Sequence, residues 1–270
     1  MEPEQKMIDF HVSETGNVQL PGIVFMHGFL GSGDDWQPIA DLLDQRFRSI
    51  LIDLPGHGST RVPAWASPLT FFSDTVDALA LMLQRNFKSP LFLAGYSMGG
   101  RLALALMLRY PELFSKSLIV SASPGIAAGK ERYDRIISDE GIARKIERNF
   151  RGFIDAWYEQ PLFATLKNHP LFNEVERRRK QGPPEELAAA LRLLGTGRQP
   201  SLWEKLKENR VPVRFFVGEK DVKFVEIGHQ MVNLCPDSSM ELFAGCGHTL
   251  HIENKALFVE RLTEFFNTYP

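Results

Sequence analysis

The sequence predicts an α/β fold in which a mostly parallel central sheet carries helices on both faces. Short apolar runs, typical of strands buried on both sides, alternate with longer segments whose apolar residues recur at helical spacing. This alternation stops between residues 123 and 210, where the patterns are helical and charged and contain no clear strand. We therefore expect residues 1–122 and 211–270 to form one core, with residues 123–210 inserted into it as a helical cap.

The first half of the chain contains most of the predicted core. Two extended pieces surround the turn sequence Glu14-Thr-Gly-Asn17, which suggests an opening hairpin over residues 8–20. The glycine-rich loop 27–33 has the composition of a phosphate cradle, but no Gly-Lys-Ser/Thr follows it, which argues against nucleotide binding. Buried strands are predicted at 23–26, 49–52, 91–94 and 117–121, and helices at 36–43, 71–83 and 101–109.

The core resumes after the cap. A strand predicted at 213–217 ends in Gly218-Glu-Lys-Asp221, and a last strand at 240–243 leads into Ala244-Gly-Cys-Gly-His248. Residues 255–266 predict an amphipathic helix, whose apolar face consists of Leu257, Phe258, Leu262, Phe265 and Phe266. Each of the last two strands is thus followed within five residues by a polar candidate, Asp221 after the first and His248 after the second.

Composition restricts the class of partner. The 31 basic and 33 acidic residues give a net charge of −2, which provides no reason to expect nucleic acid or an anionic membrane as a partner. The charge is uneven, since residues 123–210 hold 17 Lys and Arg against 13 Asp and Glu, and the rest of the chain has a balance of −6. A basic cap on an acidic core suggests an anionic ligand beneath the cap.

Neither a signal peptide nor a membrane span is predicted. The first ten residues lack the apolar core of a signal peptide, and no run of about 18 apolar residues occurs. Cys235 and Cys246 have no metal or redox spacing and are expected to be free thiols. We expect a cytoplasmic enzyme without metal or cofactor, and the sequence leaves its oligomeric state open.

The segment Gly95-Tyr-Ser-Met-Gly99 has the Gly-x-Ser-x-Gly form of a nucleophile elbow. In such a turn Ser97 lies on strained backbone between a strand and a helix, and the flanking glycines let other backbone pass where a Cβ would clash. A Gly-flanked turn without chemistry is the alternative. The apolar run before the motif and the helical pattern after it favour the elbow.

A serine hydroxyl needs an adjacent base that a third group orients. Asp221 and His248 follow two later strands, so the order along the chain is Ser, Asp, His, as in α/β-hydrolases. Glu219 and Asp237 compete with Asp221, which we prefer because it lies just beyond the strand end. Four other histidines are expected to be structural or surface residues: His57, His169, His229 and His251.

Negative charge that develops on a substrate oxygen needs donors that are fixed in advance. The candidates are the backbone N–H groups of Phe29, in the loop after the first central strand, and of Met98, directly after Ser97. The positions of these amides matter more than their side chains.

Together these segments carry a family resemblance. The α/β-hydrolase pattern is formed by five segments, His27-Gly-Phe-Leu-Gly-Ser-Gly33, Asp53-Leu-Pro-Gly-His-Gly58, Gly95-Tyr-Ser-Met-Gly-Gly-Arg101, Gly218-Glu-Lys-Asp-Val-Lys-Phe224 and Gly247-His248. The residues in these segments resemble those of the 2-succinyl-6-hydroxy-2,4-cyclohexadiene-1-carboxylate synthases of menaquinone biosynthesis. The resemblance extends from Ile8 to the last helix. Three features are more specific to this family than the general hydrolase motifs: Arg101, Glu131-Arg132 and the segment Trp157-Tyr-Glu-Gln-Pro-Leu-Phe163.

The resemblance implies a lyase on the α/β-hydrolase fold. Enzymes of this family eliminate pyruvate from 2-succinyl-5-enolpyruvyl-6-hydroxy-3-cyclohexene-1-carboxylate. By the resemblance, Ser97 activated by His248 removes a ring proton, and Asp221 orients His248. It also implies that the amides of Phe29 and Met98 hold the carboxylate whose charge grows.

A substrate with several carboxylates needs fixed cations, and the arginine fork suits carboxylates. Arg101, one helical turn beyond the nucleophile, is expected to point into the cleft, with a surface salt bridge as the alternative. Arg132 and Arg179 match the cap arginines of the family, although the arginines beside Arg179 leave its alignment open. Tyr96 and Trp157 would line the pocket, and Trp157 could equally belong to the core of the cap.

Two other functions remain open. A hydrolase of small carboxylic esters, or of carbon–carbon bonds in diketo acids, would use the same three residues with a covalent or gem-diol intermediate. A ligand-binding relative without activity would keep the fold alone. The complete Ser-Asp-His set argues against the binding protein, and the arginines argue against a neutral ester.

Overall fold

A computed structural model describes residues 7–267 of the chain, so most of the N-terminal segment predicted to lack a signal peptide lies outside it. Seven strands form one sheet in the order β1-β3-β2-β4-β5-β6-β7. All neighbours are parallel except β1, which pairs antiparallel with β3 at one edge. The strands are β1 (Val12–Thr15), β2 (Gly22–Met26), β3 (Arg48–Ile52), β4 (Leu91–Tyr96), β5 (Phe114–Val120), β6 (Val213–Gly218) and β7 (Ser238–Phe243).

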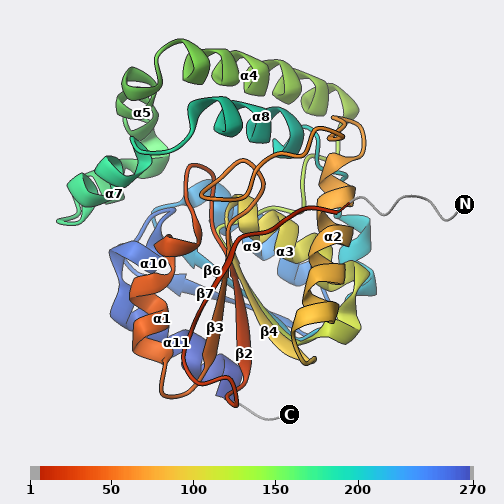
Figure 1. Cartoon of the computed structure of the whole chain (residues 1–270). Coiled ribbons are helices and arrows are strands. Elements are labelled where there is room, and N and C mark those ends of the chain that lie inside the picture. Colours follow the sequence, from red (N-terminus) through yellow and green to blue (C-terminus); the bar gives the residue numbers. More distant parts are fainter. Residues whose placement is uncertain (1–6, 268–270) are drawn as a thin grey trace, which may run out of the picture.

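Helices cover both faces of this sheet, as the sequence predicts (Figure 1). One face carries α1 (Gln37–Leu43) and α11 (Lys255–Asn267), and the other carries α2 (Phe71–Asn86), α3 (Met98–Arg109) and α9 (Val222–Leu234). This burial on both sides explains why the central strands read as continuous apolar runs, since residues 23–26 are all fully buried.

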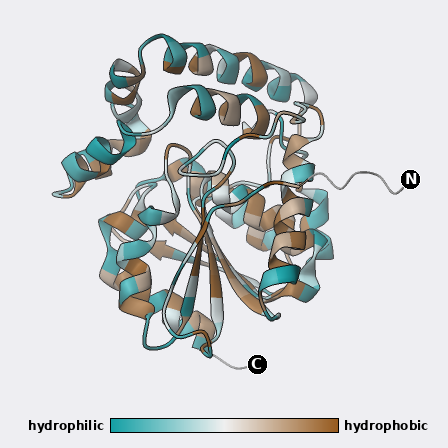
Figure 2. Ribbon diagram, viewed as in Figure 1, coloured by the Kyte–Doolittle hydropathy of each residue, from teal (hydrophilic) through white to brown (hydrophobic). Residues whose placement is uncertain are grey.

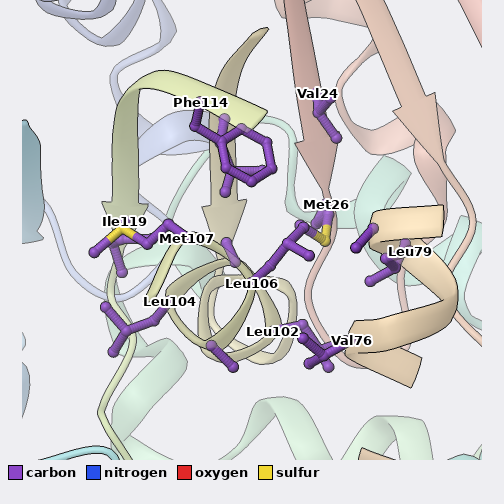
Figure 3. Packing of buried hydrophobic residues seen from close by; sticks show 14 of the residues in the cluster. Val24, Met26, Val76, Leu79, Leu102, Leu104, Leu106, Met107, Phe114 and Ile119 are labelled. Carbon is purple, nitrogen blue, oxygen red and sulfur yellow. The ribbon is translucent and has the colours of Figure 1, made fainter. Parts of the chain in front are cut away.

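The core on the α2 and α3 side is built from aliphatic side chains that interlock with the sheet. In Figure 3, Leu106 of α3 lies near Met26 of β2, and Leu102 of α3 lies near Val76 of α2. On the opposite face, the predicted amphipathic stripe of α11 buries Phe258 and three further residues, Leu262, Phe265 and Phe266. Close packing by these two helical layers fixes the positions of the carboxyl ends of the strands.

Between β5 and β6 the chain forms a separate group of helices above the carboxyl edge of the sheet (Figure 1). They are α4 (Gly129–Arg148), α5 (Phe150–Tyr158), α6 (Ala164–Lys167), α7 (Phe172–Arg179) and α8 (Pro184–Leu194). These helices share an apolar cluster, which includes Ile146, Ile154 and Leu187 and also Leu30 of the core. The predicted boundaries of the cap, 122/123 and 210/211, fall in the connections that follow β5 and precede β6.

Hydropathy separates the two regions. Hydrophobic colour is concentrated on the sheet and on the helices that pack against it, whereas much of α4 and α7 is hydrophilic (Figure 2). No helix among residues 7–267 is both long enough and apolar enough to cross a membrane.

The predicted opening hairpin is wrong. β1 is a strand, but residues 17–20 form a turn closed by the Leu20 N–H on the Asn17 carbonyl at 3.0 Å. The partner of β1 is β3, which follows it by more than thirty residues. A local turn signal cannot reveal this pairing, because the partner of β1 is the edge of β3, a strand distant in sequence that is itself paired with β2.

Two helices have no counterpart among the predicted elements, α9 and α10 (Leu250–Glu253). Few residues of α9 are buried, and its interior Gly228 lies so close to Met240 that a Cβ there would come within 2.4 Å of the Met240 sulfur. Met231 and the half-buried Ile227, Val232 and Leu234 pack α9 against the core, where it contacts β6 and β7.

Candidate active site

Ser97 lies in a strained turn between β4 and α3. Its backbone has φ 50° and ψ −107°, a conformation that is costly for a residue with a side chain. Glycines make the turn possible, because a Cβ at Gly99 would lie 2.4 Å from the Met26 carbonyl oxygen, and one at Gly95 would lie 2.6 Å from that of Gly99. The turn leaves Ser97 half-buried and lining a cavity.

The structure brings together the three residues of the predicted triad. His248 Nε2 lies 3.1 Å from Ser97 Oγ, and His248 Nδ1 lies 2.7 Å from Asp221 Oδ2. Because the carboxylate accepts the Nδ1 proton, Nε2 is left with a lone pair that faces the serine hydroxyl. His248 and Asp221 are both nearly fully buried. This arrangement can draw a proton from Ser97 and, through it, from a bound ligand.

Glu253 holds the loop that carries His248, a contact that the sequence prediction missed. Its carboxylate accepts hydrogen bonds from the Gly247 N–H at 2.7 Å and from the Thr249 N–H and hydroxyl at 3.2 and 2.6 Å. The peptide groups on both sides of the imidazole are thereby fixed. Glu253 lies only five residues after His248. An acidic residue at this short distance is the sequence signal that could have revealed the contact.

The amides of Phe29 and Met98 are in place as hydrogen-bond donors. Met98 is the first residue of α3, where N–H groups have no partner within the helix. The Phe29 loop is held by His27, whose ring accepts from the Leu54 N–H at 3.0 Å and donates to the Gly28 carbonyl at 2.7 Å. Within the described part of the chain, neither the Phe29 nor the Met98 N–H donates to another residue.

The rival acids lie elsewhere. Glu219 is exposed and accepts a hydrogen bond from the Gly245 N–H, and Asp237 occupies a turn with φ 50° before β7. Among the other histidines, His57 and His251 are buried, and burial lowers the pKa of each to about 3. Both rings are therefore neutral near neutral pH and serve as packing groups, His57 against Phe29 and His251 against Tyr96.

The cavity beneath the cap has a volume of about 390 Å³ and is lined by both regions of the chain. Ser97 and His248 contribute from the core, while Trp157, Tyr158 and Leu191 contribute from the cap. Three guanidinium groups also line it, those of Arg101, Arg135 and Arg179. The combination of apolar walls with fixed cations suits a small organic anion.

Arg101 is a buried cation without a carboxylate partner. Its guanidinium donates to the Leu194 carbonyl at 2.8 Å and to Gln199 Oε1 at 3.1 Å, which fixes its direction. Burial, aided by the positive charge of Arg135, lowers the pKa of Arg101 to about 10, so it stays charged near neutral pH. No carboxylate among residues 7–267 forms an ion pair with it. A buried, unpaired cation in a cavity wall is a strong site for an anionic ligand.

Arg179 lines the same cavity but already has a counter-charge. It donates to Asp35 Oδ1 at 2.7 Å, which joins α7 of the cap to the 3₁₀-helix η1 (Gly33–Asp35) of the core. Burial alone would lower the pKa of Arg179, but the Asp35 carboxylate outweighs it and raises that pKa. Arg179 therefore acts in the free protein as a link between cap and core.

The pair formed by Asp35 and Arg179 supports a stability prediction. Asp35→Ala should lower the free energy of unfolding by about 3–5 kcal/mol, because it leaves Arg179 buried without a counter-charge. Urea denaturation measures this change. The matched control is Asp34→Ala, an exposed neighbour expected to stay within about 0.5 kcal/mol of the wild type. A loss below about 1 kcal/mol for Asp35→Ala, as for a solvated pair, would contradict the prediction.

The structure does not place Arg132 in the cavity wall. Its guanidinium is half-buried on α4 with Nε lacking a hydrogen-bond partner, and its carbonyl faces Gly197. Arg135, three residues further along the same helix, lines the cavity instead and is paired with Asp139 at 2.7 Å. Sequence spacing left the face of α4 undetermined, because both arginines lie within one turn in a helix with few buried residues.

Tyr96 and Trp157 both line the cavity. The Tyr96 ring packs 5.4 Å from His248, and burial raises the pKa of its hydroxyl well above the usual value, so it stays protonated. Trp157 lies 5.8 Å from Phe29 and 5.4 Å from Phe153 of the cap. Trp157 therefore has both predicted roles, because it packs against Phe153 in the core of the cap and also lines the cavity.

Comparisons with known proteins agree with this geometry. A model of the alpha/beta hydrolase family matches residues 23–261. Protein PHYLLO, chloroplastic, of Arabidopsis thaliana is 33% identical over 90% of this chain, which spans only 15% of that protein. A Bacillus subtilis protein, the putative 2-succinyl-6-hydroxy-2,4-cyclohexadiene-1-carboxylate synthase, is 33% identical over 97% of this chain and 96% of its own length.

A solved structure extends the comparison to three dimensions. The structure of MenH from S. aureus superposes with a TM-score of 0.89 at 31% identity, covering 95% of this chain and 97% of that one. Similarity therefore includes the cap as well as the core. The protein belongs to the alpha/beta hydrolase family and, within it, to the 2-succinyl-6-hydroxy-2,4-cyclohexadiene-1-carboxylate synthases.

Proposed function

We propose that this enzyme eliminates pyruvate from 2-succinyl-5-enolpyruvyl-6-hydroxy-3-cyclohexene-1-carboxylate to give 2-succinyl-6-hydroxy-2,4-cyclohexadiene-1-carboxylate in menaquinone biosynthesis. The observation that carries the proposal is the buried, unpaired cation of Arg101 in the wall of the cavity that contains Ser97 and His248. A substrate with several carboxylates matches such a cavity, whereas a neutral ester has no use for the charge.

The triad acts in this proposal as a base. His248 Nε2 takes the hydroxyl proton of Ser97 as Ser97 Oγ takes the ring proton of the substrate. The electron pair of the broken C–H bond moves through the ring, and the C–O bond to the enolpyruvyl group breaks. The leaving group is the enolate of pyruvate, which becomes pyruvate by taking up one proton and so balances the proton removed from the ring. Asp221 stabilises the imidazolium that forms, and no bond between Ser97 and carbon is needed.

The amides of Phe29 and Met98 are proposed to stabilise the charge that grows during proton removal. The proton leaves the ring carbon that bears the succinyl group, so negative charge grows on the oxygen of the adjacent succinyl ketone rather than on a carboxylate. Two N–H groups without protein partners, one at the start of α3, are suited to receive that oxygen. Their donors are fixed by the elbow and by the His27 loop before the substrate arrives.

The arginines are proposed to bind the other carboxylates. Arg101 on α3 and Arg135 on α4 both line the cavity, and Tyr96 and Trp157 supply apolar walls. Arg179 would share its guanidinium between Asp35 and the ligand. Arg132, outside the wall, would act only through the position of α4.

Hydrolysis of small esters is the second candidate, supported by the distances within the triad alone. One experiment separates the two functions: pyruvate release is measured on substrate generated in place by the preceding biosynthetic enzyme, in parallel with hydrolysis of p-nitrophenyl acetate. Rapid pyruvate release with slow ester hydrolysis supports the lyase. Ester hydrolysis without pyruvate release above the rate in the absence of enzyme would refute it.

Arg101→Ala tests the binding of the carboxylates. The variant should raise KM and lower kcat/KM for pyruvate elimination by about 10²-fold, because a charge-assisted contact contributes about 1.5–3 kcal/mol and an arginine fork makes two. The matched control is Arg109→Ala at the far end of α3, where the side chain is half exposed and paired with Asp77. Unchanged kinetics in Arg101→Ala would remove the main support for a polycarboxylate substrate.

A further inference from the structure

Ser121 is a buried side chain in the cavity with no role in the mechanism above. It directly follows β5, is 1% exposed, and its Oγ has no hydrogen-bond partner in the protein. Among the described residues that line the cavity, it alone has a buried side-chain polar atom in this condition. A buried hydroxyl without a partner costs free energy, which implies that something offsets the cost.

The backbone holds this hydroxyl beside the nucleophile. Tyr96 of β4 lies opposite Val120 of β5, so Ser97 and Ser121 are the next residues along two adjacent parallel strands. The Ser97 N–H donates to the Val120 carbonyl at 2.9 Å, and the Ser121 N–H donates to the Phe216 carbonyl at 3.0 Å. The two serines therefore leave the carboxyl edge of the sheet side by side, at the floor of the cavity.

Ser121 shares a second property with Ser97. Their φ angles are 45° and 50°, in the left-handed region where a side chain is strained and glycine is relaxed. The elbow accounts for the strain at Ser97. At position 121 a glycine would satisfy the backbone at lower cost, so the strain and the unpaired hydroxyl both point to a function of the side chain.

We propose that the Ser121 hydroxyl donates a hydrogen bond to an anionic oxygen of the bound substrate, which makes it a further substrate-binding residue. This inference rests on the proposed lyase function. Arg101 and Arg135 approach the ligand from helices, whereas Ser121 supplies a neutral donor from the sheet, next to the reacting ring. The hydroxyl gains its partner only in the complex, so ligand binding recovers the cost of leaving it unpaired in the free enzyme.

Two substitutions test the proposal. Ser121→Ala removes the hydroxyl and keeps the Cβ, and Ser121→Gly also relaxes the backbone. In both, kcat/KM for pyruvate elimination should fall about tenfold, mainly through KM, as for the loss of one hydrogen bond to a charged group. The Tm of both free variants should equal or exceed that of the wild type, because an unpaired buried hydroxyl or a strained backbone has been removed.

Ser117→Ala is the matched control. Ser117 lies on β5, the strand that Ser121 follows, is fully buried and has an unpaired Oγ, but it does not line the cavity. Its removal should affect Tm as Ser121→Ala does and leave kcat/KM unchanged. The proposal is overturned if kcat/KM of both Ser121 variants stays within about twofold of the wild type, or if lost activity follows a lowered Tm. A wild-type enzyme that releases no pyruvate would instead refute the proposed function.

Discussion

Ser97→Ala should lower kcat for pyruvate elimination by about 10⁴-fold or more, because the variant has no group at the position that removes the ring proton. His248 Nε2 lies 3.1 Å behind the serine oxygen, so the imidazole cannot reach the same proton without moving. Pyruvate release under saturating substrate measures the loss. The Tm should change little, since Ser97 is only half-buried.

The control for this variant is Ser239→Ala, an exposed residue of β7 that does not line the cavity. It should retain full activity. During turnover by the wild type, mass spectrometry should find no covalent adduct at Ser97, because the proposed chemistry uses the oxygen as a base. An acyl-enzyme that accumulates, or Ser97→Ala with more than about a tenth of the normal kcat, would contradict the mechanism.

Asp221→Asn should lower kcat by about 10³–10⁴-fold, the second of the two largest effects. The carboxylate accepts the Nδ1 proton of His248 at 2.7 Å, which leaves Nε2 free to take the serine proton. An asparagine can present its amide N–H to Nδ1, which moves the imidazole proton to Nε2 and blocks proton transfer from Ser97. KM should change much less than kcat, because Asp221 does not line the cavity.

Glu219→Gln provides the matched control. Glu219 is the neighbouring acid at the same strand end, but it is exposed and binds the Gly245 N–H rather than His248. Its variant should keep kcat within about twofold of the wild type. If Glu219→Gln lost more activity than Asp221→Asn, the assignment of the third triad member would be wrong.

Local sequence was sufficient for the elements that have their own signature. The elbow around Ser97 combines a strand, two glycines and a helix within a few residues, so no distant contact is needed to predict it. The strands 23–26 and 213–217 were also predictable, since burial on both faces leaves continuous apolar runs. Chain order then identified Asp221 and His248, because parallel strands place their carboxyl ends at one edge.

Contacts between distant segments were not predictable in this way. Three features each depend on two segments that are far apart in sequence. They are the pairing of β1 with β3, the position of Arg135 rather than Arg132 in the cavity wall, and the ion pair between Arg179 and Asp35. A charged helix such as α4 has little apolar periodicity, so its orientation follows from the surface it covers.

The amino-acid sequence by itself therefore determined the fold class and the family, and it predicted the three residues that the structure brings together around Ser97, because these depend on short motifs and on their order along the chain. Tertiary structure alone decided which arginines line the cavity, and it left the Ser121 hydroxyl unpaired beside Ser97. The physical reason is that a motif specifies backbone geometry over a few residues, whereas burial and charge pairing depend on every segment that packs around a side chain.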